Sequence, residues 1–88
     1  MNKYDKDETE ILDIPIIPTV GNNTMSFVSA ISEPSGLNFD VSVAASGKSA
    51  TCLVSDGLYP NTYACKVYFS LTNGAIRAAR FQVTMLEP

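Results

Sequence analysis

Side chains that could carry out catalysis are scarce in this chain of 88 residues. It contains no histidine, which removes the usual general base, the Ser-His-Asp and Cys-His nucleophile systems and the commonest zinc ligand. Asp40 falls on the polar side of an expected strand, and Asp56 precedes a glycine in an expected turn. Both are ordinary places for an exposed aspartate, so neither is assigned a catalytic role. The sequence therefore predicts a protein that is not an enzyme.

No cofactor or metal site is indicated by the remaining residues. The five glycines are scattered one to each expected turn, so none forms a phosphate-binding loop. Twelve residues separate Cys52 from Cys65, and two thiols do not make a metal site by themselves. Both fall on the apolar side of their strands, where cysteine packs as a small hydrophobe, and two free thiols are expected. A disulfide between the neighbouring strands stays open as the alternative.

Charged and aromatic side chains near the C-terminus supply a candidate binding surface. Lys66, Arg77 and Arg80 lie on the two strands of an expected hairpin and could form a basic strip that receives an acidic partner. Tyr68 is out of phase with its apolar neighbours, which suits a contact surface. The alternative for these four residues is an ordinary solvated strand face.

The N-terminal segment carries the imbalance in charge, because the first thirteen side chains sum to −3 and the rest sum to zero. Four acidic residues stand there without any hydrophobic period around them: Asp5, Asp7, Glu8 and Glu10. Residues 1–10 are therefore predicted to be a flexible acidic arm that orders only against a partner, such as the basic strip of a neighbouring copy. A frayed terminus is the alternative. Residues 11–88 are expected to form a single domain.

The overall charge argues against two classes of partner. The net charge is −3 at pH 7, and only six residues are basic. Nucleic acids and anionic membranes are bound through clustered Lys and Arg, so neither is expected to bind this protein. No segment approaches the roughly 18 apolar residues of a membrane span, and the N-terminus lacks the apolar run of a secretory signal. The protein is therefore expected to be made in the cytoplasm.

The elements that would position these side chains are strands. Residues 62–71 alternate in hydrophobicity, Thr72-Asn73-Gly74 has the composition of a tight turn, and residues 81–85 alternate again. This pattern predicts an antiparallel hairpin with one buried face.

Further strands are expected upstream of the hairpin. Residues 11–18 are rich in isoleucine but contain Pro15 and Pro18, which cannot donate ladder hydrogen bonds, so this run is predicted to be an edge strand. Residues 37–43 alternate strictly and require one wet and one dry face. Two more strands are expected at 24–31 and 49–55.

Six or seven strands separated by Gly, Asn and Pro turns, with no helical period, predict an all-β fold. A single small antiparallel sandwich is favoured over a small barrel. The inner faces of its two sheets would pack against each other. The residues expected there are Phe39, Val41, Val43, Cys65, Val67, Phe69, Phe81, Val83 and Met85.

Several short motifs follow one another in a recognisable order. They are Lys6-Asp7, Ile11-Leu12-Asp13, Gly21-Asn22-Asn23-Thr24-Met25, Gly36-Leu37, Val54, Asp56-Gly57, Thr62-Tyr63, Thr72-Asn73-Gly74, Arg77 and Arg80-Phe81. In order and spacing, residues 5–85 resemble a group of short bacteriophage virion proteins with an Ig-like or fibronectin III-like sandwich. The segment from Leu58 to Tyr63 is also similar to the tyrosine corner of such domains.

This resemblance implies a non-enzymatic structural accessory protein of a phage virion, either a capsid decoration or a head-tail neck or tail component. Its partners would be capsid, portal or tail proteins, its location the virion, and it would need no cofactor; a homo-oligomer is left open. The alternatives are a carbohydrate-binding or adhesion module of a fibre, and a small phage protein that binds a host protein. The absence of tryptophan counts against sugar binding, because sugar rings commonly stack on exposed aromatics.

Overall fold

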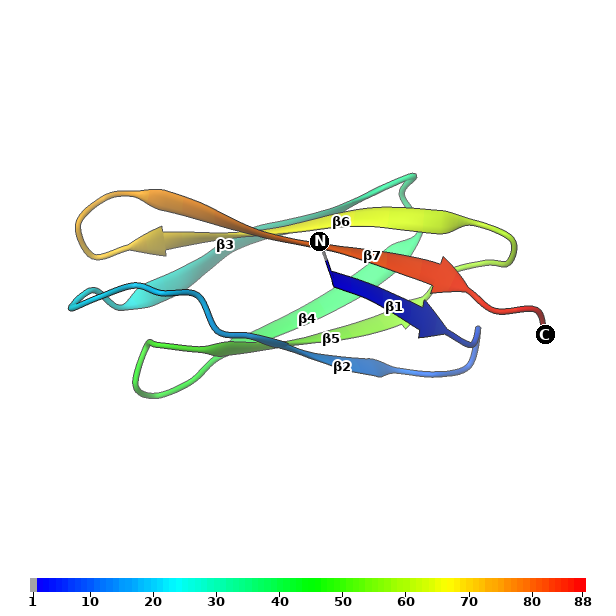
Figure 1. Ribbon diagram of the computed structural model, residues 1–88, viewed down its shortest axis with the longest axis horizontal. Coiled ribbons are helices and arrows are strands. Elements are labelled where there is room, and N and C mark those ends of the chain that lie inside the picture. The colour runs from blue at the N-terminus through cyan, green and yellow to red at the C-terminus, as the bar shows by residue number, and fades with distance from the viewer. Residues whose placement is uncertain (1) are drawn as a thin grey trace.

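The computed structural model describes residues 2–88 and contains seven strands in two packed sheets (Figure 1). The strands are β1 (Asn2–Lys6), β2 (Leu12–Ile16), β3 (Met25–Glu33), β4 (Leu37–Val43), β5 (Ala50–Asp56), β6 (Thr62–Leu71) and β7 (Ile76–Met85). One sheet has the order β1-β7-β6-β3, and the other has the order β2-β5-β4. The all-β, sandwich-like architecture predicted from the sequence is confirmed, but the prediction of wholly antiparallel sheets is wrong, because β1 pairs with β7 in parallel.

The predicted C-terminal hairpin is formed by β6 and β7, which pair in antiparallel fashion. In its turn, the Gly74 amide donates to the Leu71 carbonyl at 2.9 Å, and the Leu71 amide donates to the Ala75 carbonyl at 2.8 Å. Strand β7 begins at Ile76, five residues before the predicted start at Phe81. The turn sets the register, so pairing extends through Arg77-Ala-Ala-Arg80 even though those residues do not alternate in hydrophobicity.

The N-terminal segment differs from the expected flexible arm. Residues Asn2–Lys6 form strand β1, which pairs in parallel with β7 from Phe81 to Met85. Tyr4 faces inward, and its ring meets the Phe81 ring edge-on at a centroid distance of 6.0 Å. Strand β1 contains a single aromatic residue and no aliphatic one, so its hydropathy pattern carried no signal of a strand; the exposed backbone edge of β7 orders it. Met1 of the predicted arm lies outside the described residues.

Strand β2 has the edge position predicted from its prolines. Among the described residues it pairs only with β5, and Pro15 lies opposite Thr51 in that ladder. Ile14 and Ile16 on either side of Pro15 are buried, so the strand presents its apolar side chains to the core and the proline to solvent. The missing N–H of Pro15 is tolerated because one edge of β2 has no strand beside it.

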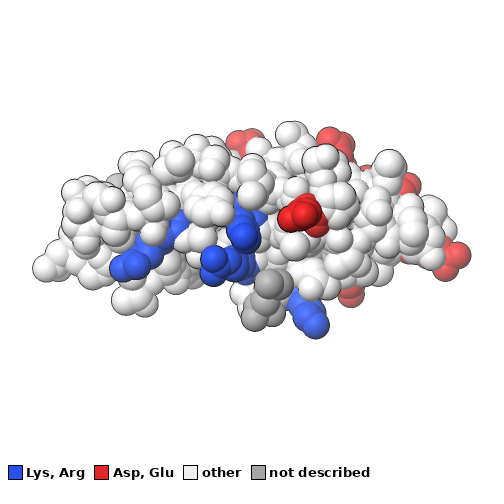
Figure 2. Space-filling view, turned by 90° about the horizontal axis from the view of Figure 1, so that it is seen from above, with Lys and Arg blue, Asp and Glu red and all other residues white. Residues whose placement is uncertain are grey.

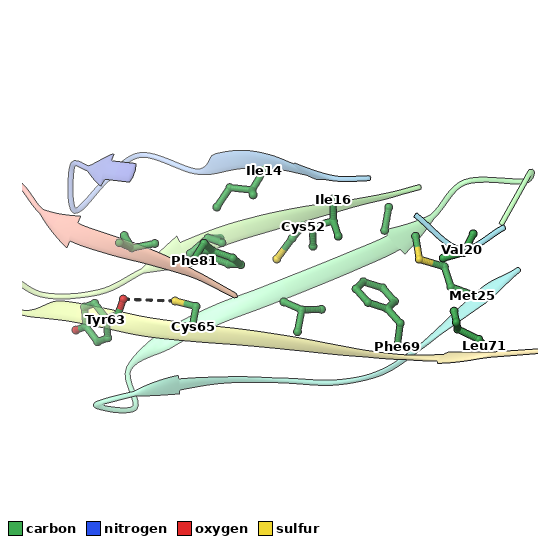
Figure 3. Packing of buried hydrophobic residues seen from close by; sticks show 14 of the residues in the cluster. Ile14, Ile16, Val20, Met25, Cys52, Tyr63, Cys65, Phe69, Leu71 and Phe81 are labelled. Atoms are coloured by element: carbon green, nitrogen blue, oxygen red, sulfur yellow. Dashed lines mark hydrogen bonds between the residues drawn. The ribbon is translucent and has the colours of Figure 1, made fainter. Parts of the chain in front are cut away.

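The core lies between the two sheets, and the view in Figure 3 shows side chains from both sheets meeting there. Its buried members are Ile14, Ile16, Val20, Met25, Ala50, Cys52, Val54, Tyr63, Cys65, Val67, Phe69, Leu71, Phe81, Val83 and Met85. Fully burying a residue such as Val or Phe contributes about 1.5–3 kcal/mol each. Three predicted core residues of β4, namely Phe39, Val41 and Val43, are only half-buried, because β4 is an edge strand.

Tyr63 fastens the loop that joins β5 to β6. Its hydroxyl accepts a hydrogen bond from the backbone N–H of Leu58 at 3.1 Å and lies 3.4 Å from Asn61 Nδ2. The ring is 1% exposed at the start of β6. The corner hydrogen bond suggested by the Leu58–Tyr63 segment is therefore present.

Candidate functional site

The outer face of the four-stranded sheet, which points away from β2-β5-β4, carries two of the predicted basic residues side by side. Lys66 on β6 lies directly opposite Arg80 on β7. Both point outward, because their neighbours Cys65, Val67 and Phe81 are buried. Lys66 and Arg80 are called the basic pair below. Figure 2 looks onto this face and shows Lys and Arg side chains gathered near its middle.

The two positive charges of the basic pair repel each other in the isolated sheet. Directly opposed like charges destabilise an antiparallel pair of strands. The partner of Lys66 on its other side is Ile31, which is 52% exposed, so no carboxylate lies directly across from Lys66 in the ladders of residues 2–88. An anionic group placed on this face would relieve the repulsion.

Tyr68 shares the outer face with the basic pair, as its phase predicted. It lies opposite Ala78 on one side and Ser29 on the other, and it is half-buried. The small side chains on either side leave its ring as the bulkiest group in that row. The two features predicted separately, a basic strip and an outward tyrosine, thus form one surface.

Arg77 does not belong to this surface. It lies opposite the buried Phe69, so its side chain is on the face of the sheet opposite to that of the basic pair. Arg77 is nevertheless exposed. The prediction of a three-residue basic strip is wrong for Arg77, because the hairpin register places it out of phase with Arg80. Of the three predicted basic residues, only Lys66 and Arg80 lie together on the outer face.

The predicted acidic contacts lie away from the basic pair. Asp5 on β1 is opposite Thr84, four residues beyond Arg80 on β7, which is about 13 Å along a strand. Asp7 accepts hydrogen bonds from the backbone N–H and the hydroxyl of Thr9, both at 2.9 Å, and these bonds lower the pKa of the Asp7 carboxyl. Its own amide donates to Glu10 Oε1 at 3.1 Å. These contacts make a compact turn.

Glu8 joins that turn to the rest of the fold. Its Oε2 accepts a hydrogen bond from the backbone N–H of Tyr59 at 2.9 Å. Lys6, which precedes the turn, is fully buried and donates from Nζ to the Asp7 carbonyl at 2.9 Å. The acidic segment is thus held against its own domain, contrary to the expectation that it orders only on a partner.

Cys52 and Cys65 are free and buried, as expected, on strands of opposite sheets. Burial is the main cause that raises the pKa of Cys52 to about 11 and that of Cys65 to about 12. Both therefore remain neutral thiols up to well above pH 8, and the thiolate is the reactive form. This environment suits packing, and it makes neither cysteine a nucleophile.

We expect an aromatic disulfide reagent at pH 8 to label neither cysteine in the folded protein within minutes and to label both in concentrated guanidinium chloride. Protection depends on the fold, because unfolding returns both thiols to a pKa near 9. Absorbance of the released thiolate measures the count. If the unfolded chain were not labelled, the two cysteines would be joined in a disulfide. Rapid labelling of the folded protein would contradict the buried environment.

A groove opens between the edges of the two sheets, where β1 and β7 face β2. Its volume is about 270 Å³, and its apolar lining includes Tyr4, Ile14, Ile16, Ile17, Pro18 and Phe81. This groove is called the edge groove below. The sequence did not predict it, because its lining comes from three segments that are distant along the chain. The sequence signal that could have indicated the groove was the apolar run that continues past Pro15. Ile17 in this run is 77% exposed.

Residues 2–88 contain no group of three or more His, Cys, Asp or Glu side chains able to hold a metal ion. Within the same range, no helix is long and apolar enough to cross a membrane. Every buried side-chain nitrogen or oxygen in this part of the chain has a hydrogen-bond partner.

Comparison of the chain with protein-family models, curated proteins and solved structures finds no match.

Proposed function

We propose that this protein is a non-enzymatic accessory protein of a bacteriophage virion, a capsid decoration or a head-tail neck or tail component, that acts by binding other virion proteins. The observation that carries the binding function is the basic pair, Lys66 opposite Arg80, on an exposed sheet face. The virion setting rests on the resemblance of residues 5–85 to short phage virion proteins. The protein would be made in the host cytoplasm and then assembled into particles.

An Ig-like arrangement of the strands is part of this proposal. In Ig domains of the constant type, one sheet has the strands A, B, E and D and the other has C, F and G, in Greek-key connection. When the seven strands are named A to G in sequence, the orders β7-β6-β3 and β2-β5-β4 follow those sets for six strands, whereas β1, the counterpart of A, pairs with β7. The hydrogen bond from Leu58 to Tyr63 fits the tyrosine corner of the same domains.

The outer face suits a protein partner with negative charge. Two like charges held opposite each other lower the stability of the free protein, and an acidic partner surface offsets that cost on binding. Tyr68 on the same face adds an amphipathic ring of the kind enriched in interfaces. Ser29 and Ala78 beside it are small enough to let a partner approach the sheet closely.

We expect the protein to be present in purified particles, and replacing both Lys66 and Arg80 by glutamine to deplete it from them at least tenfold. The control is the pair Asn38→Glu and Thr51→Glu, which changes the net charge by the same two units on exposed positions of the other sheet. Quantitative mass spectrometry of particles measures the copy number of each form.

Absence of the wild-type protein from particles would exclude the virion role, and equal depletion by the control pair would exclude the basic pair as the contact. A host protein retained on the wild-type protein but not on the glutamine variant would favour the host-binding alternative. Glycan binding that weakens in a Tyr68→Ala variant would favour the adhesion alternative.

A further inference from the structure

Part of the outer edge of β7 has no strand beside it. Strand β1 covers β7 only from Phe81 to Met85, which leaves Ile76–Ala79 without a paired strand among residues 2–88. In Figure 1, the first half of β7, in orange, lies beyond the point where β1, in dark blue, begins. This uncovered stretch, Ile76–Ala79, is called the open edge below.

The backbone groups that face outward at the open edge follow from the hairpin register. The Leu71 amide donates to the Ala75 carbonyl, so Ala75 directs its backbone toward β6. Backbone direction alternates along an antiparallel ladder, and Ile76 and Ala78 therefore direct their N–H and C=O groups away from β6. Among residues 2–88, no strand pairs with β7 at these positions, so these outward groups have no ladder partner. They can pair with an added strand.

The open edge adjoins the edge groove. Ala79 and Arg80 of β7 line the groove together with Ile16 of β2 and with Ile17 and Pro18, which directly follow β2. Side chains of a strand alternate between its two sides. A strand added along the open edge would therefore point every second side chain toward the groove and the others toward the outer face, where the basic pair lies.

We propose that the open edge binds an extended segment of a partner protein, with apolar side chains entering the edge groove and acidic side chains facing the basic pair. This inference rests on the binding function proposed above and names the partner's chemistry. Charge complementarity selects an acidic segment, because Arg77 lies within the open edge, Arg80 directly follows it, and Lys66 lies opposite Arg80. Backbone hydrogen bonds would supply affinity, and the alternating side chains would supply specificity.

Two other occupants fit the open edge less well. Pairing with the same edge of a second copy would bring Arg77 and Arg80 of both copies together, and like charges in neighbouring strands repel. The acidic turn of a second copy, from Asp7 to Glu10, is closed by its own hydrogen bonds and held by Tyr59. A segment of a different protein that is free to extend meets neither obstacle.

The test uses the full-length protein and a capped peptide of alternating glutamate and valine, EVEVEVE. In amide NMR spectra we expect the peptide to shift the signals of Ile76 and Ala78 and to slow their hydrogen exchange. Ala78→Pro removes an outward N–H without removing a bond to β6, so this variant should fold and bind at least fivefold more weakly. The charge-reversed peptide KVKVKVK should bind at least tenfold more weakly to the wild-type protein.

N-methylated peptides separate strand pairing from other modes of binding without altering the protein. In an extended strand, the valine N–H groups point to one edge and the glutamate N–H groups to the other. Methylation of one set should abolish binding, and methylation of the other should leave it within about twofold. Equal effects of the two sets, unchanged signals at Ile76 and Ala78, equal binding of KVKVKVK, or no binding at millimolar EVEVEVE would each overturn the inference.

The inference and the proposed function can fail separately. Strand pairing by a protein that is absent from particles would overturn only the virion role. Incorporation of the Ala78→Pro variant at the wild-type level, with no peptide binding by either protein, would overturn only the role of the open edge.

Discussion

Replacing Phe81 by alanine is expected to lower the free energy of unfolding by about 3–5 kcal/mol, the usual loss for a buried phenylalanine. Phe81 is 3% exposed on β7. Its ring packs edge-on against Tyr4 of β1 at a centroid distance of 6.0 Å and against Phe39 of β4 at 6.4 Å. The substitution would thus loosen a contact between the sheets and the attachment of β1 together. Since the free energy of unfolding of native proteins is only about 5–15 kcal/mol, this substitution would remove much of the stability.

Urea unfolding followed by circular dichroism measures this loss, and Phe27→Ala is the matched control. Phe27 also forms an edge-on aromatic pair, with Phe69 at 6.3 Å, but it is 43% exposed. We expect the control to lose about 1 kcal/mol, because less of the ring leaves the core. Equal losses for Phe81 and Phe27 would contradict the central position assigned to Phe81.

The Gly47→Ala substitution is expected to lower the free energy of unfolding by about 2–4 kcal/mol, for two reasons that add. Gly47 has φ = +70°, a left-handed conformation that costs a residue with a Cβ roughly 1 kcal/mol. A Cβ there would also lie 2.5 Å from Cβ of Thr24, and forced overpacking costs about 1–3 kcal/mol. The loop cannot move away freely, because the Gly47 carbonyl accepts the Met25 amide at 2.9 Å and its amide donates to Ala44.

Gly21→Ala separates these two causes. Gly21 has a similar φ of +61°, and a Cβ added there would meet no atom within 4 Å. We expect this variant to lose only the conformational share, about 1 kcal/mol, in the same urea titration. If Gly21→Ala and Gly47→Ala were equally destabilising, the close approach of the Gly47 loop to Thr24 would be contradicted.

Much of the fold was predictable because strand patterns are local. The alternation in residues 62–71 and 37–43 identified β6 and β4, and the prolines identified β2 as an edge strand. The hairpin turn also determines that Lys66 lies opposite Arg80 and that Arg77 lies opposite Phe69. Counting outward from the turn would have separated Arg77 from the basic strip, so that error lay in the interpretation and not in the information available.

The N-terminus shows where local pattern fails. Lys6 was predicted to be solvated, as part of a flexible acidic arm. In the structure it is fully buried, and its Nζ donates a hydrogen bond to the Asp7 carbonyl. Strand β1 owes its existence to β7, about eighty residues away, which offers unpaired backbone groups and the ring of Phe81. The hydropathy of these five residues cannot indicate that a strand edge from a distant part of the chain pairs with them.

The sequence by itself determined the all-β class, the C-terminal hairpin, the inward phase of β5, β6 and β7, and the pairing that creates the basic pair. These follow from side-chain alternation and turn chemistry, which act between near neighbours. Tertiary structure alone decided that β1 pairs with β7 from Phe81 onward, that Ile76–Ala79 is left open, and that a groove forms beside it. Those features depend on how two sheets of unequal width and length pack, and that packing joins residues that no local pattern connects.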